Sequence, residues 1–208
     1  MNIENNITDY NDIPNTKTTS AYLNYRAHQK HEVYQIFTDF LETARPKRIL
    51  EIGTWEGGFT LFLNDISNKL KLNCSILTYD IFNMVEHEIL RNNGIDVRLE
   101  NIFNEDFSSI INPYAIDFVK QEGTTLVLCD GHNKKLEFRC FAPLLKIGDI
   151  LMAHDYAENE EIFQERKLWP SYEVCESDVS ETCVQYNLVS YNKEKFDSVV
   201  WLCKKKIS

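Results

Sequence analysis

The stretch RILEIGTWEGGFTLFL, residues 48–63, decides the fold of this chain. It begins as a short apolar run, turns at Gly53, offers two more glycines at Gly57 and Gly58, and becomes apolar again. A strand that ends in a glycine turn and continues as a helix is typical of α/β proteins that hold a small molecule. Trp55 stands where the dinucleotide motif GxGxxG needs its second glycine, so a diphosphate is not the expected ligand.

Strands and helices alternate after this turn. The expected strands are 48–53, 75–81, 96–102, 124–131 and 149–156, and the expected helices are 59–69, 84–92, 107–120, interrupted near Pro113, and 134–145. This alternation predicts right-handed crossovers and an α/β fold with a doubly wound, mostly parallel sheet. Two β-rich runs, 183–191 and 197–205, predict an antiparallel C-terminal hairpin with no helix between its strands, giving about seven strands in all.

The N-terminal part of the chain has a different pattern. Residues 1–20 are polar, and apolar residues recur at helical spacing over 21–43, which predicts one or two amphipathic helices ending at the RPK sequence of 45–47. We expect residues 1–47 to form an arm and a helical lid, and 48–208 to form the ligand-binding α/β domain. Ordinary packing of an amphipathic helix is the alternative to a lid.

Composition limits the partners. The 208 residues suit one globular domain, and a formal charge of −10 opposes binding to nucleic acid. No apolar run approaches the ~20 residues of a membrane helix, and the first residues do not resemble a signal peptide. The six cysteines form no CxxC pair and are expected to be buried free thiols. We therefore expect a cytoplasmic protein without a membrane partner, and leave a homodimer open.

Two acidic residues indicate the kind of ligand. Glu51 stands beside the glycine turn, where a carboxylate repels phosphate and attracts a cation. Asp80 ends the second expected strand, where an acid accepts hydrogen bonds from ribose hydroxyls. S-adenosylmethionine fits both, because it carries a ribose, a positive amino group and a sulfonium but no phosphate. The alternative is that the glycines only form a turn and that Asp80 only caps a helix.

With these residues the sequence resembles the class I S-adenosylmethionine-dependent methyltransferases. LEIGTWEGGFT resembles their first motif, LTYDI their second, and the terminal hairpin their antiparallel last strand, so the likeness covers about residues 48–205. In that family the segment after the third strand meets the adenine, which makes Asn101 or Asn104 a candidate contact, with turn formation as the alternative. The candidate cofactor-binding residues are Glu51, Gly53, Thr54, Gly57, Gly58, Asp80, Asn101 and Asp130.

Two more expected strands end in titratable side chains. Asp130 and His132 follow the fourth strand, and His154 and Asp155 follow the fifth, so we expect the four to lie near one another. Asp130 and Asp155 suit Mg²⁺, and His154 would be a third ligand for a softer ion such as Mn²⁺ or Fe²⁺. His132 is a candidate general base. Taken singly, each residue also has an ordinary structural explanation, as a helix cap, a core imidazole or a surface group.

The segment 128–156, LCDGHNKKLEFRCFAPLLKIGDILMAHDY, resembles the metal-dependent small-molecule O-methyltransferases. That group includes cephalosporin-biosynthesis enzymes, macrolide and aminocoumarin sugar O-methyltransferases and, more distantly, the catechol and caffeoyl-CoA types. The resemblance implies metal ligands at Asp130 and Asp155, with His154 at an often acidic position and His132 at the position of a proposed base. Histidines at 132 and 154, and Asp149 in place of a second glycine, depart from the group's pattern.

The sequence as a whole predicts a methyltransferase that acts on a small-molecule hydroxyl, in a sugar or a phenol, with Asp130 and His132 as catalytic residues. A divalent cation would assist. One rival is a degenerate member of the fold that binds a nucleoside without catalysis, and a second, disfavoured by Trp55, is an NAD-dependent oxidoreductase. Trp169 and Tyr172, in the acidic segment 157–174, are candidates for the acceptor pocket or for plain packing.

Overall fold

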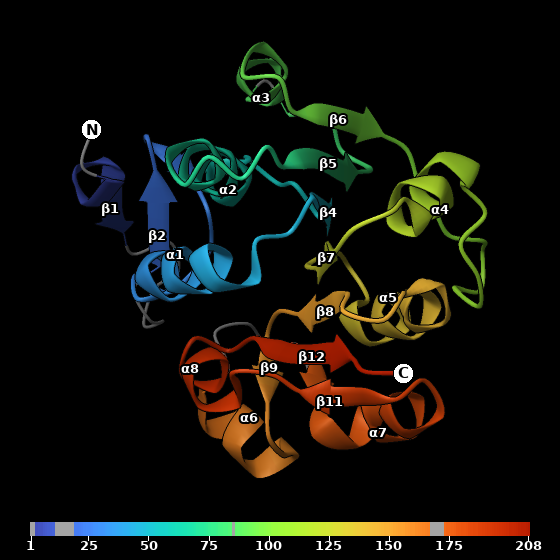
Figure 1. Ribbon diagram of the computed structural model, residues 1–208. Coiled ribbons are helices and arrows are strands. Elements are labelled where there is room, and N and C mark those ends of the chain that lie inside the picture. Colours follow the sequence, from blue (N-terminus) through green and yellow to red (C-terminus); the bar gives the residue numbers. More distant parts are fainter. Residues whose placement is uncertain (1–2, 11–18, 85, 167–172) are drawn as a thin grey trace.

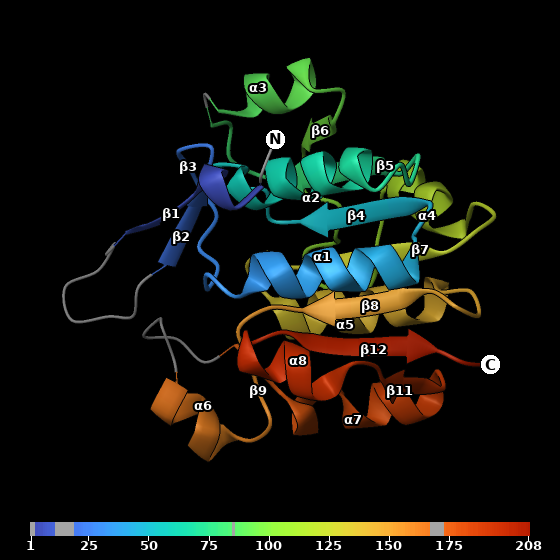
Figure 2. The ribbon, with the colours of Figure 1, turned by 60° about the vertical axis from the view of Figure 1, so that its left-hand side comes forward.

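A computed structural model describes residues 3–10, 19–84, 86–166 and 173–208, so Trp169 and Tyr172 lie outside the described residues. A seven-stranded sheet in the order β11-β12-β8-β7-β4-β5-β6 forms its centre (Figure 1). The strands are β4 (Arg48–Ile52), β5 (Ser75–Asp80), β6 (Asp96–Leu99), β7 (Thr125–Cys129), β8 (Ile150–Ala153), β11 (Leu188–Ser190) and β12 (Leu202–Lys206). β4 to β8 pair in parallel, whereas β12 is antiparallel to both β8 and β11 (Figure 2). The predicted doubly wound sheet is confirmed.

Helices cover both faces of the sheet. One face carries α1 (Val33–Ala44), α2 (Gly58–Lys69), α3 (His87–Asn92) and α8 (Lys193–Ser198), and the other carries α4 (Pro113–Lys120), α5 (Lys134–Phe141) and α7 (Glu176–Gln185) (Figures 1 and 2). A one-turn helix, η2 (Ala142–Leu144), extends α5. Every residue of β4, β7 and β8 is buried, as expected for strands covered on both faces. Successive side chains alternate between the two cores, as Ile49 and Leu50 do.

Local capping sets where two of the predicted helices begin. Asn112 accepts a hydrogen bond from the Ala115 N–H, and Pro113 occupies the first helical position, so α4 begins at the predicted interruption and the part expected over 107–112 is not helical. Asn133 accepts a hydrogen bond from the Leu136 N–H and starts α5 at the predicted residue.

The prediction of helix over residues 21–32 is wrong. Strands β1 (Ile7–Tyr10), β2 (Thr19–Tyr22) and β3 (Tyr25–Arg26) form an antiparallel sheet, and a 3-10 turn, η1 (Ile3–Asn6), precedes them. Leu23 and Asn24 both have positive φ, 52° and 69°, and form a two-residue hairpin turn that pairs Tyr22 with Tyr25. The aromatic spacing that suggested a helix belongs to this hairpin.

The C-terminal hairpin is confirmed as a strand pair but not as a simple turn. Residues 183–185 end α7 instead of starting a strand, and α8 lies between β11 and β12, where no helix was expected. The chain enters α8 through Asn192, whose φ is 52°, and Phe196 buries its ring completely in the core. Burial of this one aromatic side chain stabilises a helix too short for its sequence pattern to predict.

Two further pieces lie beyond the sheet. β9 (Tyr156–Ala157) pairs in parallel with β10 (Val174–Cys175), and α6 (Glu160–Arg166) leads away from β9. All six cysteines are free thiols, five of them buried and Cys74 partly so, as predicted. Among the described residues, no helix combines the length and the apolar character that crossing a membrane requires.

Helix α1 belongs to the main core. The Phe37 ring is fully buried, with ring centroids of Phe59, Phe196 and Trp201 at 5.0, 5.3 and 5.6 Å. These partners come from α2, α8 and the approach to β12, so residues 33–44 and the α/β sheet share one hydrophobic cluster. The division of the chain at residue 47 stays a prediction, but the packing joins its two parts.

Replacing Phe37 tests whether this shared core unfolds as one unit. Phe37→Ala is expected to destabilise the protein by about 3–5 kcal/mol, because it removes a buried ring and leaves a cavity. Urea unfolding followed by circular dichroism should show one cooperative transition at lower denaturant. Phe82→Ala is the control, since that ring is 62% exposed and its loss should change stability by less than about 0.5 kcal/mol. Separate unfolding of α1 would contradict the shared core.

Candidate functional site

A cavity of about 840 Å³ opens beyond the carboxyl ends of β4, β5, β7 and β8. The chain adds β5 and β6 on one side of β4 and β7 and β8 on the other, so the strand order reverses between β4 and β7. The cavity lies at this point, the usual place for a ligand in a doubly wound sheet. Its volume is within the range of small-molecule sites. The N-terminal segment contributes Arg26, Ala27 and His28 to the wall, so the segment predicted as a lid does line the cavity, although as a strand end and a loop.

The glycine turn brings backbone close to backbone. Gly53 lines the cavity with a φ of 91°, and a Cβ there would come within 2.2 Å of the Asp130 carbonyl oxygen. A Cβ on Gly58 would come within 2.2 Å of the Tyr25 carbonyl oxygen, and one on Gly57 would meet the Leu90 side chain. Among the described residues, the cavity wall includes Gly53 but neither Gly57 nor Gly58. Those two glycines therefore allow the chain to approach itself.

Glu51 lies near the end of β4, directly before the glycine turn. Its side chain is almost completely buried, and Oε2 accepts hydrogen bonds from Thr60 Oγ1 at 2.6 Å and Thr78 Oγ1 at 2.7 Å. Thr54 Oγ1 lies 2.6 Å from Thr78 Oγ1, which extends the network to the cavity wall. Burial raises the pKa of Glu51 to about 8, even though the two hydroxyls act to lower it. At neutral pH this buried position therefore favours the protonated carboxyl.

Asp80 fixes the second strand end. Its Oδ2 accepts the Trp55 N–H and its Oδ1 accepts the Phe82 N–H, both at 2.8 Å. Trp55 has a φ of 51° and its carbonyl oxygen lies 2.7 Å from His87 Nε2, so the turn is held from two sides. Asp80 lines the cavity, and each of its oxygens keeps a second lone pair for a ligand hydroxyl.

The two candidate asparagines differ in position. Asn101 lines the cavity while its Oδ1 accepts the Phe103 N–H at 3.0 Å. Asn104 bonds to Ser108 and Ser109 within its own turn, which is the turn-forming alternative. Only Asn101 of the pair belongs to the described cavity wall.

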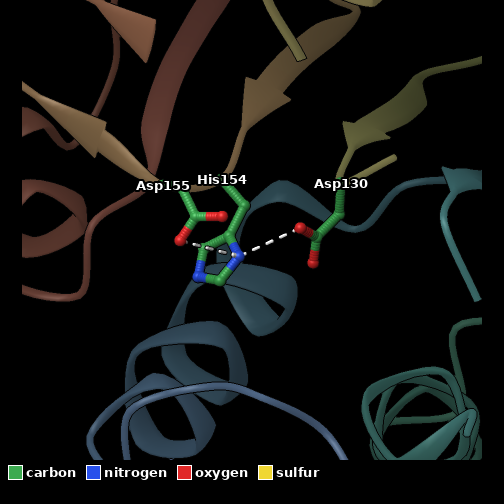
Figure 3. A group of neighbouring side chains, drawn as sticks. All are labelled: Asp130, His154 and Asp155. Atoms are coloured by element: carbon green, nitrogen blue, oxygen red, sulfur yellow. Dashed lines mark hydrogen bonds and ion pairs between the residues drawn. The ribbon is translucent and has the colours of Figure 1, made fainter. Parts of the chain in front are cut away.

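Asp130, His154 and Asp155 come together as the sequence predicted. His154 Nδ1 lies 3.0 Å from Asp130 Oδ1 and 3.8 Å from Asp155 Oδ1, with the imidazole between the two carboxylates (Figure 3). The ring is buried and stacks on Trp201 with centroids 4.7 Å apart. Burial acts to lower the pKa of His154, but the carboxylates of Asp130 and Asp155 outweigh it and the net pKa is raised. One candidate ligand atom from each residue lies within 4.8 Å of the others.

Gln29 completes this cluster, although no sequence pattern indicates it. The fully buried amide donates from Nε2 to Asp130 Oδ2 at 3.1 Å and accepts from Trp201 Nε1 at 2.9 Å. Gln29 therefore orients the carboxylate and connects the N-terminal segment to the floor of the cavity. Its partners lie 101 and 172 positions away in the chain, so no local pattern could reveal it.

Lys134 was also missed, although it lies in the quoted DGHNKK sequence. Its Nζ donates to the Gly131 carbonyl oxygen at 3.0 Å and lies 3.1 Å from Asp155 Oδ2. Glu173 Oε2 and Asp130 Oδ1 follow at 3.6 and 3.8 Å. Burial acts to lower the pKa of Lys134, but the surrounding carboxylates raise it, so the ammonium stays charged. A divalent ion held by the same carboxylates would lie beside this ammonium, so the site fits such an ion poorly.

His132 is exposed on the rim of the cavity. Glu137 shapes the turn that carries it, because its buried carboxyl accepts the N–H groups of Gly131 and Asn133 at 3.2 and 3.0 Å. Burial raises the pKa of Glu137 to about 7. His132 and Asp130, two positions apart in the chain, both line the cavity.

Comparisons with known proteins bear on the fold. No protein-family model matches this chain, and no curated protein matches it. Among solved structures, the D160 form of CmcI with Mg and SAM matches over 90% of this chain and 76% of its own, with 15% identity and a TM-score of 0.56. A Staphylococcus aureus protein provisionally assigned as a caffeoyl-CoA O-methyltransferase matches over 85% and 84%, with 15% identity and a TM-score of 0.54. The SAH-bound methyltransferase PaMTH1 of Podospora anserina matches over 85% of this chain and 78% of its own, with 13% identity and a TM-score of 0.51.

At these identities the likeness defines the fold. The strand order, the antiparallel β12 and the cavity beyond β4 make this the Rossmann-like fold of the class I S-adenosylmethionine-dependent methyltransferases. Within that class, the neighbours include proteins named as O-methyltransferases, and the predicted resemblance to that group is confirmed at the level of fold.

The raised pKa of Glu51 predicts a pH-dependent stability. Its folded value of about 8 exceeds the ordinary 4.5, so the folded protein holds a proton that the unfolded chain releases. The resulting stability is fully present below pH 4.5 and is lost as the pH rises through 8. Glu51→Gln should therefore gain stability relative to the parent protein, by on the order of a few kcal/mol, between these limits.

Urea unfolding of both proteins at pH 5 and pH 9, about the ends of that window, measures the difference. The exposed Glu88→Gln on α3 is the matched control and should follow the parent at both pH values. Parallel pH profiles for Glu51→Gln and the parent protein would show that Glu51 ionises normally.

Proposed function

We propose that this protein is an S-adenosylmethionine-dependent methyltransferase that acts on a hydroxyl group of a small molecule, a sugar or a phenol. The acidic lining of the cavity carries the proposal. The carboxyl groups in the described wall are Glu51, Asp80, Glu100, Asp130, Glu137, Asp155 and Glu173. Burial favours the protonated form of Glu51 and raises the pKa of Glu137, but the other five carboxyl groups still outnumber the cationic side chains of the described wall, Arg26, Lys134 and His154 with its raised pKa. Such a cavity favours a cationic ligand and opposes a diphosphate.

The wall residues divide naturally between the parts of the cofactor. Asp80 suits the ribose hydroxyls, and the apolar side chains of Ile81, Phe82, Ile102 and Phe103 suit an aromatic base. The carboxyls of Glu51 and Asp130 lie at the ends of β4 and β7, where they would attract the amino acid end of the cofactor through its ammonium group. Asn101 lines the wall beside the base-binding side chains.

When bound, the cofactor supplies an electrophilic methyl group on its sulfonium. The protein then has to hold the acceptor hydroxyl in line and remove its proton. We assign the role of base to His132, which lines the cavity. Asp130 is held by Gln29 and His154, so its direction is fixed before an acceptor enters.

Two rival functions remain distinct from this proposal. A nucleoside-binding protein without catalysis would use the same Asp80 and the same apolar wall but would not need His132. An NAD-dependent oxidoreductase is disfavoured because Trp55, and not glycine, occupies the turn where a diphosphate would meet the backbone. The structural neighbour from Staphylococcus aureus whose name is that of an O-methyltransferase supports the first proposal.

Loss of the Asp80 carboxylate tests the cofactor. Asp80→Ala should weaken S-adenosylhomocysteine binding by about 1–3 kcal/mol, because ribose hydroxyls lose a charged acceptor and the Trp55 turn loses its anchor. Isothermal titration calorimetry measures the change. Asp117→Ala, on α4 and outside the described cavity wall, is the control and should bind normally. Absence of binding by the parent protein would sink the proposed cofactor.

Replacement of His132 separates an enzyme from a binding protein. His132→Ala should lower turnover roughly 10²–10⁴-fold while S-adenosylhomocysteine affinity stays nearly unchanged, because a base acts on the acceptor proton and not on the cofactor. Turnover is measured as methyl transfer to a panel of sugars and phenols. His31→Ala, which pairs with Asp9 outside the described wall, is the matched control. If neither His132→Ala nor Asp130→Ala slows the reaction, its chemistry lies elsewhere.

A further inference from the structure

The ammonium group of Lys134 occupies the centre of the acidic cluster. It lies within 3.1–3.8 Å of one carboxylate oxygen each from Asp155, Glu173 and Asp130. These carboxylates come from the end of β7, the residue after His154 and the segment before β10. One cation therefore attracts and connects three separate parts of the cavity wall.

The chain holds this ammonium firmly. Lys134 is the first residue of α5, where Asn133 caps the helix and Glu137 ties down the preceding turn. Only 6% of the residue is exposed, and its Nζ also donates to the Gly131 carbonyl oxygen, which lies in that same turn. Moving the ammonium out would leave the buried Asp155 carboxylate without this cation and would break the bond to Gly131.

We propose that Lys134 is the built-in cation of this site and takes the place of a divalent metal ion. The cluster of Asp130, His154 and Asp155 has the residue types of a metal site. The ammonium already lies 3.1–3.8 Å from carboxylate oxygens of Asp155, Glu173 and Asp130, so a divalent ion held by these groups would need to displace Lys134. This inference concerns the occupant of the site, and its metal-binding test holds whether or not the protein transfers methyl groups.

Its consequence for catalysis rests on the proposed function. If the protein is a methyltransferase, Lys134 supplies the positive charge at the acceptor end of the cavity, where it lines the wall beside Asp130 and His132. Turnover should then persist in excess EDTA. A methyltransferase that EDTA inactivates and Mn²⁺ restores would contradict the inference, and a protein without turnover leaves the metal-binding test intact.

Titration with Mn²⁺, followed by electron paramagnetic resonance of the free ion, provides that test. Lys134→Met keeps most of the apolar stem and removes the charge, so three carboxylates would face an uncharged space. This variant should bind Mn²⁺ at least about tenfold more tightly than the parent protein. Lys134→Arg keeps a cation and should bind no better than the parent. Lys135→Met removes the neighbouring, half-buried lysine that pairs with Asp178 and serves as the matched control.

Several results would overturn the proposal. One is tight Mn²⁺ binding by the parent protein that Asp155→Asn abolishes, a measurement that needs no lysine variant. Another is unchanged Mn²⁺ affinity in a folded Lys134→Met, with circular dichroism as the check on folding. Lys134→Gln is a second neutral variant if Lys134→Met does not fold, and it should show the same gain in Mn²⁺ affinity. Removal of that gain by a further Asp155→Asn would locate the ion at this cluster.

Discussion

The hydrogen bonds of the Asp130 carboxylate join the parts of the molecule that form the cavity. One oxygen accepts from Gln29 in the N-terminal segment, and the other lies against His154 at the end of β8. The backbone of the same residue packs so closely on Gly53 that no side chain fits between them. Asp130, directly after β7, thus contacts three parts of the cavity wall. Its backbone packs on the turn after β4, and its carboxylate positions the N-terminal segment and orients His154.

The central sheet could be predicted because its signals are local. Strands such as β4 and β7 are short apolar runs bounded by turn residues. Only the centre of a sheet that is covered on both faces buries every residue of such a strand. The prediction failed at the N-terminal hairpin because Tyr22 and Tyr25 fit a helical period. The feature that decides the structure there, the left-handed turn at residues 23–24, has no distinctive sequence. Helix α8 depends on burial of Phe196 against α1, a contact across the whole chain.

In the candidate site, the positions of the residues at the strand ends were also predictable. Parallel neighbours end at the same edge, so Asp130, His154 and Asp155 had to meet once β7 and β8 paired. That rule places residues but does not say what fills the space between them. The ammonium of Lys134 and the amide of Gln29 reach the cluster through tertiary packing, and both change its chemistry, one by supplying charge and the other by fixing direction.

The acidic cavity also shows how stability and ligand binding oppose each other here. A protonated Glu51 suits its buried position beside the turn, and ionising it there is unfavourable, as its pKa of about 8 indicates. A cationic ligand reverses this preference, because it interacts favourably with the ionised form and thereby lowers the same pKa. Ionisation of Glu51 lowers the stability of the folded protein but favours a cationic ligand, so binding of such a ligand should release a proton. Burial of Glu51 therefore couples the protonation of this carboxyl to the charge of the ligand beside it.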